Sequence, residues 1–178
     1  MVVLGWWVLL VLVLLTAGLV GLTAFRYGLL PTLFGGPPYV PTSDRLVEAM
    51  CDLAAFTRGD KVVDLGSGDG RLIFAAAKRD VTEAIGYEID PWQVWRARSW
   101  AKRFGHVNAR FEWRSFWDAP LNDVNVVFVY GLPPYMARVA DKCAKELPSG
   151  ARVVCLLCTL PGWTPVKTDD GIYLYVKV

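Results

Sequence analysis

The first 25 residues form one apolar stretch, dominated by Leu, Val, Trp and Ala, in which no side chain carries a charge. About 20 such residues span the hydrocarbon layer of a bilayer as a helix. Trp6 and Trp7 near one end, and Arg26 and Tyr27 at the other, are residue types typical of membrane interfaces. A cleaved signal peptide is the alternative, but it expects basic residues before a shorter apolar core, and none precedes Arg26. We therefore expect residues 1–28 to be a retained transmembrane anchor helix.

A proline and glycine cluster follows the apolar stretch. Residues 29–38 include Pro31, Gly35, Gly36 and Pro37, which cannot continue a helix, and we interpret them as a linker. The remaining residues, 39–178, suffice for one domain. Arg26 follows the apolar helix and no basic residue precedes it, so the positive-inside rule predicts a single-pass protein whose domain faces the cytoplasm or an equivalent reducing compartment.

Beyond residue 39, stretches with helical spacing of apolar residues alternate with short apolar runs rich in β-branched residues. The helical stretches are 43–56, 71–79, 91–104 and 134–146. The strand-like runs are 61–65, 84–88, 109–113, 124–130, 152–159 and 172–178. Strands that alternate with helices are typical of a mainly parallel sheet covered on both faces. We therefore predict a doubly wound, Rossmann-like α/β domain after the anchor.

The helix expected over 91–104, with Asp90 as its N-cap and Pro91 at its first position, has an unusual composition. It combines tryptophans with basic residues, namely Trp92, Trp95, Trp100, Arg96, Arg98, Lys102 and Arg103. We expect the tryptophans to face the sheet and the basic residues to face solvent. The alternative is a surface that rests on anionic lipid headgroups beside the anchor.

The four cysteines and the net charge exclude some classes of site. Cys51, Cys143, Cys155 and Cys158 are best interpreted as reduced, buried thiols. Cys155 and Cys158 lie on one expected strand and point to opposite faces, and His106 is the single histidine, so we expect no metal site. A net charge of +2 gives no general preference for nucleic acid.

The strongest chemical signal is a glycine-rich turn between the strand at 61–65 and the next helix. It carries Asp64, Gly66, Ser67, Gly68, Asp69 and Gly70. Such turns lie at the carboxyl ends of the strands, where ligands bind, and glycine lets the backbone approach a ligand closely. A dinucleotide site would have G-x-G-x-x-G and would bind a pyrophosphate. Here the spacing is G-x-G-x-G with two carboxylates, which suit the ammonium and sulfonium groups of S-adenosylmethionine.

The second signal is an acidic residue at the end of the next strand. Glu88 lies 20 residues after Gly68, where carboxylates of nucleotide-binding folds accept hydrogen bonds from ribose hydroxyls. We predict Glu88 as the ribose ligand, with Ile89 beside it in the cofactor site. Asp90 is explained by its capping role alone. Together the two motifs predict that S-adenosylmethionine binds here and leaves as S-adenosylhomocysteine.

These motifs resemble those of the seven-β-strand protein-lysine methyltransferases. The similarity is carried by residues 39–42, 64–71, 86–91, 115–117, 126–133, 150–154 and 161–165. It is closest to the small group that includes the mitochondrial enzymes modifying adenine nucleotide translocase and the ATP synthase c-subunit, and their prokaryotic relatives. Its mitochondrial members are similar in having a hydrophobic N-terminal segment. The resemblance implies lysine N-methylation of a protein, with a membrane protein as the expected partner.

The resemblance also implies roles for residues outside the two motifs. Ser115 and Phe116 are expected to border the adenine, and Tyr39 and Thr42 to close over the methionine end of the cofactor. A lysine must be neutral to attack a methyl group, so its channel must desolvate it or offer a proton acceptor. Tyr130 and Tyr39 are the candidate catalytic residues lining that channel. The alternative for Tyr130 is a tyrosine that only packs at a strand end.

Three other functions stay open. Gly131-Leu132-Pro133-Pro134-Tyr135 stands where methyltransferases of nucleic-acid bases have Asp/Asn-Pro-Pro-Tyr, but leucine cannot accept hydrogen bonds from an amine, so we expect no nucleic-acid partner. Methylation of a lipid or small amphiphile would be served equally well by the anchor. A cofactor-binding membrane scaffold without turnover is the non-enzyme alternative.

Overall fold

The computed structural model describes residues 2–26, 40–131 and 133–178, and the chain divides into two compact units, Met1–Val40 and Pro41–Val178. The expected linker at 29–38 and the expected site residue Tyr39 lie outside the described residues.

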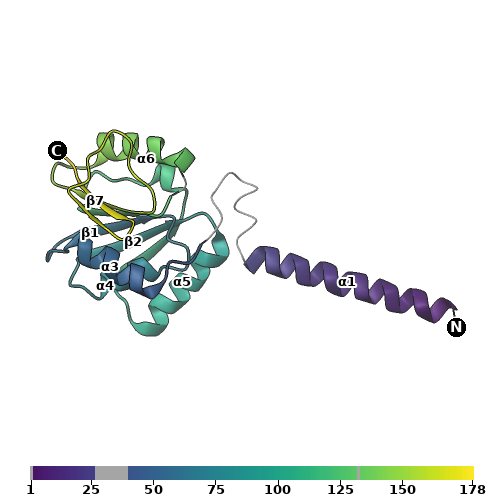
Figure 1. Ribbon diagram of the computed structural model, residues 1–178. Helices are drawn as coiled ribbons and strands as arrows, with labels where there is room; N and C mark the ends of the chain where they lie inside the picture. The colour runs from purple at the N-terminus through teal and green to yellow at the C-terminus, as the bar shows by residue number, and fades with distance from the viewer. Residues whose placement is uncertain (1, 27–39, 132) are drawn as a thin grey trace. The chain divides into compact units, whose positions relative to one another are not determined.

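The first unit contains helix α1 (Val2–Arg26), whose described side chains are almost all exposed (Figure 1). Its segment Gly5–Phe25 has a mean hydropathy of 2.6 and is long and apolar enough to cross a membrane, a test that a signal sequence also passes. Twenty-five residues make a helix about 37 Å long, against a hydrocarbon layer of about 30 Å. The hydroxyls of Thr16 and Thr23 each donate to the carbonyl three residues earlier, which satisfies both donors within the helix.

The second unit is built on a seven-stranded sheet in the order β3-β2-β1-β4-β5-β7-β6. The strands are β1 (Lys61–Leu65), β2 (Glu83–Glu88), β3 (Ala109–Trp113), β4 (Val126–Val129), β5 (Arg152–Leu156), β6 (Lys167–Asp169) and β7 (Ile172–Val176). β1 to β5 are parallel, and β7 runs antiparallel to both β5 and β6. The predicted mainly parallel sheet is confirmed. The short strand β6 was not predicted, because its residues are exposed and carry no apolar alternation.

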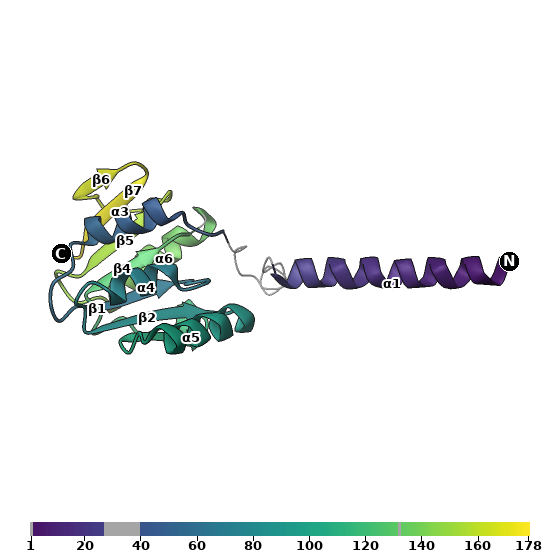
Figure 2. The same cartoon turned by 90° about the horizontal axis from the view of Figure 1, so that it is seen from below.

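Helices cover both faces of the sheet, as predicted. They are α3 (Asp44–Ala54), α4 (Arg71–Ala77), α5 (Pro91–Phe104), the 3₁₀ turn η1 (Phe116–Asp118) and α6 (Pro133–Glu146). Figures 1 and 2 show α3, α4 and α5 on one face and α6 on the other. The first three pack on one apolar cluster with alternate residues of the strands, such as Val62 and Phe128. α6 packs on a second cluster with the intervening residues, such as Val63 and Val127. Central strands buried on both faces explain the continuous apolar runs in the sequence.

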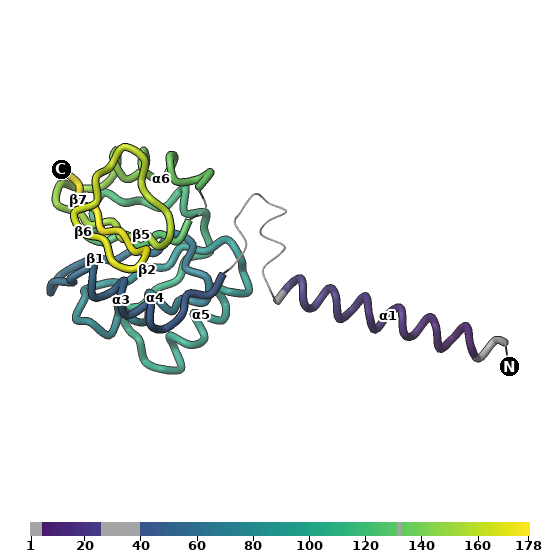
Figure 3. The backbone as a smooth tube through the Cα atoms, viewed as in Figure 1, coloured from purple at the N-terminus to yellow at the C-terminus, as the bar shows by residue number. Residues whose placement is uncertain are grey.

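Strand β5 is shorter than expected. The sequence predicted a strand over 152–159, but β5 ends at Leu156 because Leu157 adopts a left-handed backbone with φ of 60°. The Leu157 N–H donates to the Gly171 carbonyl at 2.8 Å, which fixes the turn toward the β6–β7 hairpin, whose path Figure 3 traces in yellow. Cys158 therefore lies beyond the strand, half-buried, whereas Cys155 is buried within it. All four cysteines are free thiols.

The predicted orientation of α5 was wrong. Its buried residues are Gln93, Val94 and Ala97, whereas Trp95 and Trp100 are 57% and 40% exposed. The helix packs on β2 and β3 through small side chains. A rotation of 100° per residue then carries the tryptophans away from the sheet. The predicted cap is confirmed, since the Asp90 carboxylate accepts from the Trp92 and Gln93 N–H groups.

Candidate cofactor site

The register of the parallel strands brings the expected site residues to one edge of the sheet. Leu65 at the end of β1 pairs with Tyr87 of β2 and with Val129 of β4. The residues that follow, Gly66, Glu88 and Tyr130, therefore leave the sheet side by side at its carboxyl edge. This edge is where open α/β sheets bind ligands.

The glycine loop takes a conformation that needs glycine. Gly66, Gly68 and Gly70 all have positive φ, and the Gly66 and Ser67 N–H groups both donate to the Tyr87 carbonyl at 3.0 Å. A Cβ on Gly70 would lie 2.5 Å from the ring of Phe111. A Cβ on Gly66 would meet nothing within 4 Å. The loop therefore packs closely against Phe111 at Gly70, and it has free space at Gly66, where a ligand can approach the backbone.

Glu88 is fixed in place by the backbone around it. Its Oε2 accepts from the Gly68 N–H at 2.8 Å, and its Oε1 accepts from the Ile89 and Asp90 N–H groups at 2.8 and 2.9 Å. Burial raises the pKa of Glu88 above its ordinary value, and these backbone hydrogen bonds counteract part of that rise. A carboxylate has about four lone-pair sites, and three accept from the backbone here, so about one remains for a hydroxyl donor of a ligand.

Two further carboxylates lie beside Glu88. Asp64 and Asp69 are 4% and 6% exposed. Burial raises the pKa of Asp64 to about 8, and the negative charges of Glu88 and Asp69 add to the rise. Concentrated negative charge of this kind stabilises a cation and repels a phosphate. The electrostatics therefore match the expectation of a positively charged ligand.

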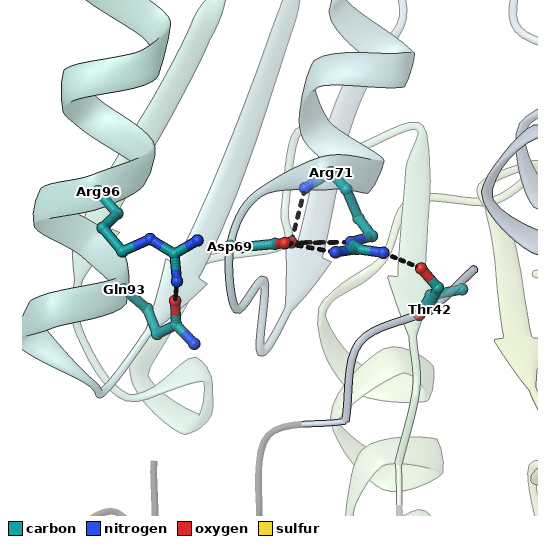
Figure 4. A network of polar contacts seen from close by, with 5 residues as sticks. All are labelled: Thr42, Asp69, Arg71, Gln93 and Arg96. Atoms are coloured by element: carbon teal, nitrogen blue, oxygen red, sulfur yellow. Dashed lines mark hydrogen bonds and ion pairs between the residues drawn. The ribbon is translucent and has the colours of Figure 1, made fainter. Parts of the chain in front are cut away.

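Arg71 connects this site to the segment that precedes α3, as Figure 4 shows. Its Nε lies 3.0 Å from Asp69 Oδ1, one of its terminal nitrogens lies 2.6 Å from Asp69 Oδ2, and the other donates to the Thr42 carbonyl. Thr42, buried at 7% exposure, is thereby held against the glycine loop. The sequence-based prediction gave Arg71 no role. The sequence signal that could have revealed this contact is Asp69, an acidic residue in the glycine loop that needs a partner if it is buried, followed two positions later by a basic residue.

Two buried polar atoms have no hydrogen-bond partner among the described residues, Ser67 Oγ and Gln93 Nε2. Ser67 fits against Gly86, where a Cβ would lie 2.5 Å from the serine oxygen. Gln93 occupies the third position of α5, from which a glutamine often reaches back to the N-cap N–H. Here Glu88 accepts from the Asp90 N–H instead, the Gln93 Oε1 accepts from a terminal nitrogen of Arg96 at 3.1 Å, and the Gln93 Nε2 donor is left for another acceptor. Buried unpaired donors beside a carboxylate cluster fit a polar, cationic ligand such as S-adenosylmethionine.

The other expected residues lie as follows. Ser115 caps η1, and Phe116, half-buried, packs on Trp117 with ring centroids 4.5 Å apart. They follow β3, whose Trp113 pairs with Glu88, so they too are at the carboxyl edge. Tyr130, half-buried, packs against the core beneath α3 and α4. The roles of these residues toward adenine and lysine stay predictions.

Comparison with known proteins decides the family. The family model described as the ANTKMT methyltransferase domain matches residues 64–167, which include the glycine loop and Glu88. The chain belongs to this family. It is a methyltransferase whose methyl donor is S-adenosylmethionine. The sequence predicted both.

Individual relatives extend the match beyond the family domain. The ATP synthase c-subunit lysine N-methyltransferase of Homo sapiens is 36% identical, over 89% of this chain and 71% of the relative. The adenine nucleotide translocase lysine N-methyltransferase of Mus musculus is 42% identical, over 78% of this chain and 62% of the relative. A solved RNA methyltransferase from Salinibacter ruber, in complex with S-adenosyl-L-homocysteine, has a TM-score of 0.71 and 33% identity, covering 78% of this chain and 92% of its own.

Because the pKa of Asp64 is raised, we expect binding of S-adenosylmethionine to release a proton. The pKa rises from 3.8 to about 8, so ligand-free Asp64 holds a proton at pH 7, and a cation that ionises it must displace that proton. We expect the affinity for S-adenosylmethionine to rise as the pH goes from 6 to about 8. By the same linkage, Asp64 contributes stability that is lost as the pH rises from about 4 to about 8.

Calorimetric titration at pH 7 in two buffers of different ionisation enthalpy measures this proton. Wild type should give different apparent heats in the two buffers. The variant Asp64→Asn, which keeps the shape and cannot ionise, should give nearly equal heats. Equal heats for the wild-type protein would exclude a proton on Asp64 in the ligand-free site.

Proposed function

We propose that this chain transfers a methyl group from S-adenosylmethionine to the ε-amine of a lysine in a membrane protein. The observation that carries the proposal is the cluster of Asp64, Asp69 and Glu88 at the open edge beside Gly66, in a member of a methyltransferase family. The chain's relatives are named for lysine N-methylation of the ATP synthase c-subunit and of adenine nucleotide translocase, both membrane proteins.

Each residue of the site has its own role in binding the cofactor or the lysine. When bound, S-adenosylmethionine supplies a methyl group on a positively charged sulfur, and its transfer to an amine is an in-line displacement that needs alignment more than acid–base chemistry. Glu88 holds the ribose through its remaining lone pair, and Asp64 balances the positive charge, because the Asp69 carboxylate is already paired with Arg71. Tyr130 lies at the end of β4, next to Gly66, and lines the path of the incoming lysine. A half-buried path favours the neutral form of the lysine amine, since burial disfavours the charged ammonium.

The domain organisation follows from the same proposal. Residues 1–28 anchor the chain in the bilayer, 29–38 link it, and 39–178 form the methyltransferase domain on the cytoplasmic or equivalent reducing side. Four free thiols, three of them buried, suit such a compartment. An enzyme held at the bilayer meets its membrane-protein substrate at a raised local concentration.

Base methylation is a second candidate, because the solved structure from Salinibacter ruber is described as an RNA methyltransferase. Position 132 argues against it for this chain. An exocyclic amine needs a hydrogen-bond acceptor there, and Leu132 offers none.

The fate of a labelled methyl group separates these functions. The full chain in detergent is incubated with methyl-labelled S-adenosylmethionine, membranes and RNA, and the three fractions are counted. We expect the label in protein, recovered as methyl-lysine after hydrolysis. Label in the organic extract would indicate a lipid acceptor, and label in RNA a base. A chain that binds the cofactor but labels no fraction would be a scaffold without turnover.

A further inference from the structure

Large apolar side chains are exposed along α5, in the turn that follows it and on β3. Trp95, Phe104 and Trp113 are 57%, 66% and 66% exposed, and Val107 in the turn is 94% exposed. We call these elements the α5–β3 surface, residues 91–114. Exposed patches of this kind mark interaction sites.

Basic side chains are interleaved with these aromatic residues. The α5–β3 surface carries Arg96, Arg98, Lys102, Arg103, Arg110 and Arg114, and α5 itself has no acidic residue. Arg96 stacks over the Trp100 ring at 5.1 Å, and Arg103 lies 5.9 Å from the Phe104 ring centre. Two carboxylates balance part of this charge, Glu83 paired with Arg110 at 2.8 Å and Glu112 with Arg114 at 3.7 Å. The surface is therefore both apolar and net positive, although the whole chain carries only +2.

A groove of about 670 Å³ runs between α5 and β3. Arg98, Arg110, Arg114 and Trp113 are among the residues that line it. Arg98 also donates from Nε to the Phe111 carbonyl at 2.8 Å, which covers the outer edge of the sheet. Three guanidinium groups and an indole line this groove beside one carboxylate, Glu112, so the lining is net positive and suits a phosphate at an apolar boundary, since guanidinium binds phosphate in a bidentate manner.

We propose that the α5–β3 surface docks on the anionic face of a membrane, with lipid phosphates in the groove and the tryptophans at headgroup level. Tryptophan and arginine are the residues that proteins place at this boundary. The inference rests on the proposed retention of α1 as an anchor. Fourteen residues separate Arg26 from Pro41, so the domain stays within about 50 Å of the end of a membrane-spanning α1. Val107, 94% exposed among the basic groups, favours lipid over RNA, because an aliphatic side chain can neither stack on a base nor bind a phosphate.

Quenching of tryptophan by brominated lipids tests this docking. The full chain, with Trp6→Phe and Trp7→Phe to remove emission from α1, is incorporated into nanodiscs of brominated phosphatidylcholine alone or mixed with phosphatidylserine. We expect stronger quenching in the anionic discs. The double variant Lys102→Glu/Arg103→Glu should lose this excess quenching, whereas Lys145→Glu/Lys167→Glu, with the same charge change on exposed residues of α6 and β6, should keep it.

The outcomes separate docking from anchoring. A chain that elutes with the discs but is quenched equally in both compositions would overturn the docking. A chain that elutes without the discs contradicts the anchor, and docking is then measured by sedimentation with anionic and zwitterionic vesicles, where equal binding overturns it. Binding of a single-stranded RNA that is lost in Lys102→Glu/Arg103→Glu, with no lipid dependence, would assign the surface to RNA instead.

Discussion

Replacing Glu88 with alanine is expected to weaken binding of S-adenosylmethionine by roughly 10- to 100-fold, since a hydrogen bond to a charged group contributes about 1.5–3 kcal/mol and a ribose hydroxyl loses its acceptor. The substitution also releases the Gly68 N–H, which donates to Glu88 at 2.8 Å and holds the glycine loop against β2. Binding of S-adenosylhomocysteine should fall by a similar factor, because both molecules carry the ribose. Calorimetric titration of the detergent-solubilised chain measures both.

Glu83→Ala is the matched control for this experiment. Glu83 begins the same strand that Glu88 ends, and it pairs with Lys61 and Arg110 at the far edge of the sheet. Its replacement should leave cofactor affinity unchanged. A folded Glu88→Ala protein, with a wild-type circular dichroism spectrum and wild-type affinity, would show that the ribose lies elsewhere.

The part of the site that could be predicted from the sequence is the part set by local backbone. Gly66, Gly68 and Gly70 have positive φ, and glycine is the residue that adopts such angles at low cost. Glu88 ends a strand that the apolar run defines, and its bonds to the next two N–H groups are local as well. A short motif therefore fixes most of the cofactor cradle without reference to the remainder of the chain.

What could not be predicted depends on packing between distant segments. Arg71 reaches Thr42, 29 residues away, and no spacing rule connects them. The orientation of α5 depends on which residues fit against β2 and β3, and Ala97, not a tryptophan, does so. Hydrophobicity alone assigned the tryptophans to the core, whereas Val94 and Ala97 are the α5 residues buried in the cluster that contains Ala84 and Ala109, and this leaves the tryptophans toward the surface.

The exposed tryptophans change the character of α5. With tryptophans in the core, α5 would be an ordinary amphipathic helix with a solvated basic face. With Trp95 57% exposed, α5 instead presents a large aromatic surface, which contact with a lipid headgroup layer would bury. The N-terminal end of α5 is capped by Asp90, two residues after Glu88, and carries Gln93, whose amide nitrogen is buried. One helix therefore connects the proposed membrane surface with the cofactor site.

Arg71→Ala is expected to lower the free energy of unfolding by about 2–3 kcal/mol. This is at or below the lower end of the cost of removing one partner of a buried ion pair, because the arginine itself is partly exposed. The Asp69 side chain is 8% exposed and Arg71 is 32% exposed. The substitution removes both the opposing charge and the link to Thr42, while Asp64 and Glu88 stay close by. Urea unfolding measures the loss, which should become smaller at acidic pH because protonation removes negative charge from the cluster.

Arg79→Ala is the control for the loss of an arginine that follows the same helix. Arg79 is 27% exposed and pairs with Glu48 and Asp52, whose side chains are 62% and 74% exposed, so water replaces the lost contacts and the change should stay within about 1 kcal/mol. The double variant Asp69→Asn/Arg71→Ala should recover much of the stability lost in Arg71→Ala, because no buried charge is left opposite the missing guanidinium. If Arg71→Ala proves no more harmful than Arg79→Ala, the Asp69–Arg71 pair does not stabilise the glycine loop, and the position of Thr42 over the site must come from other contacts.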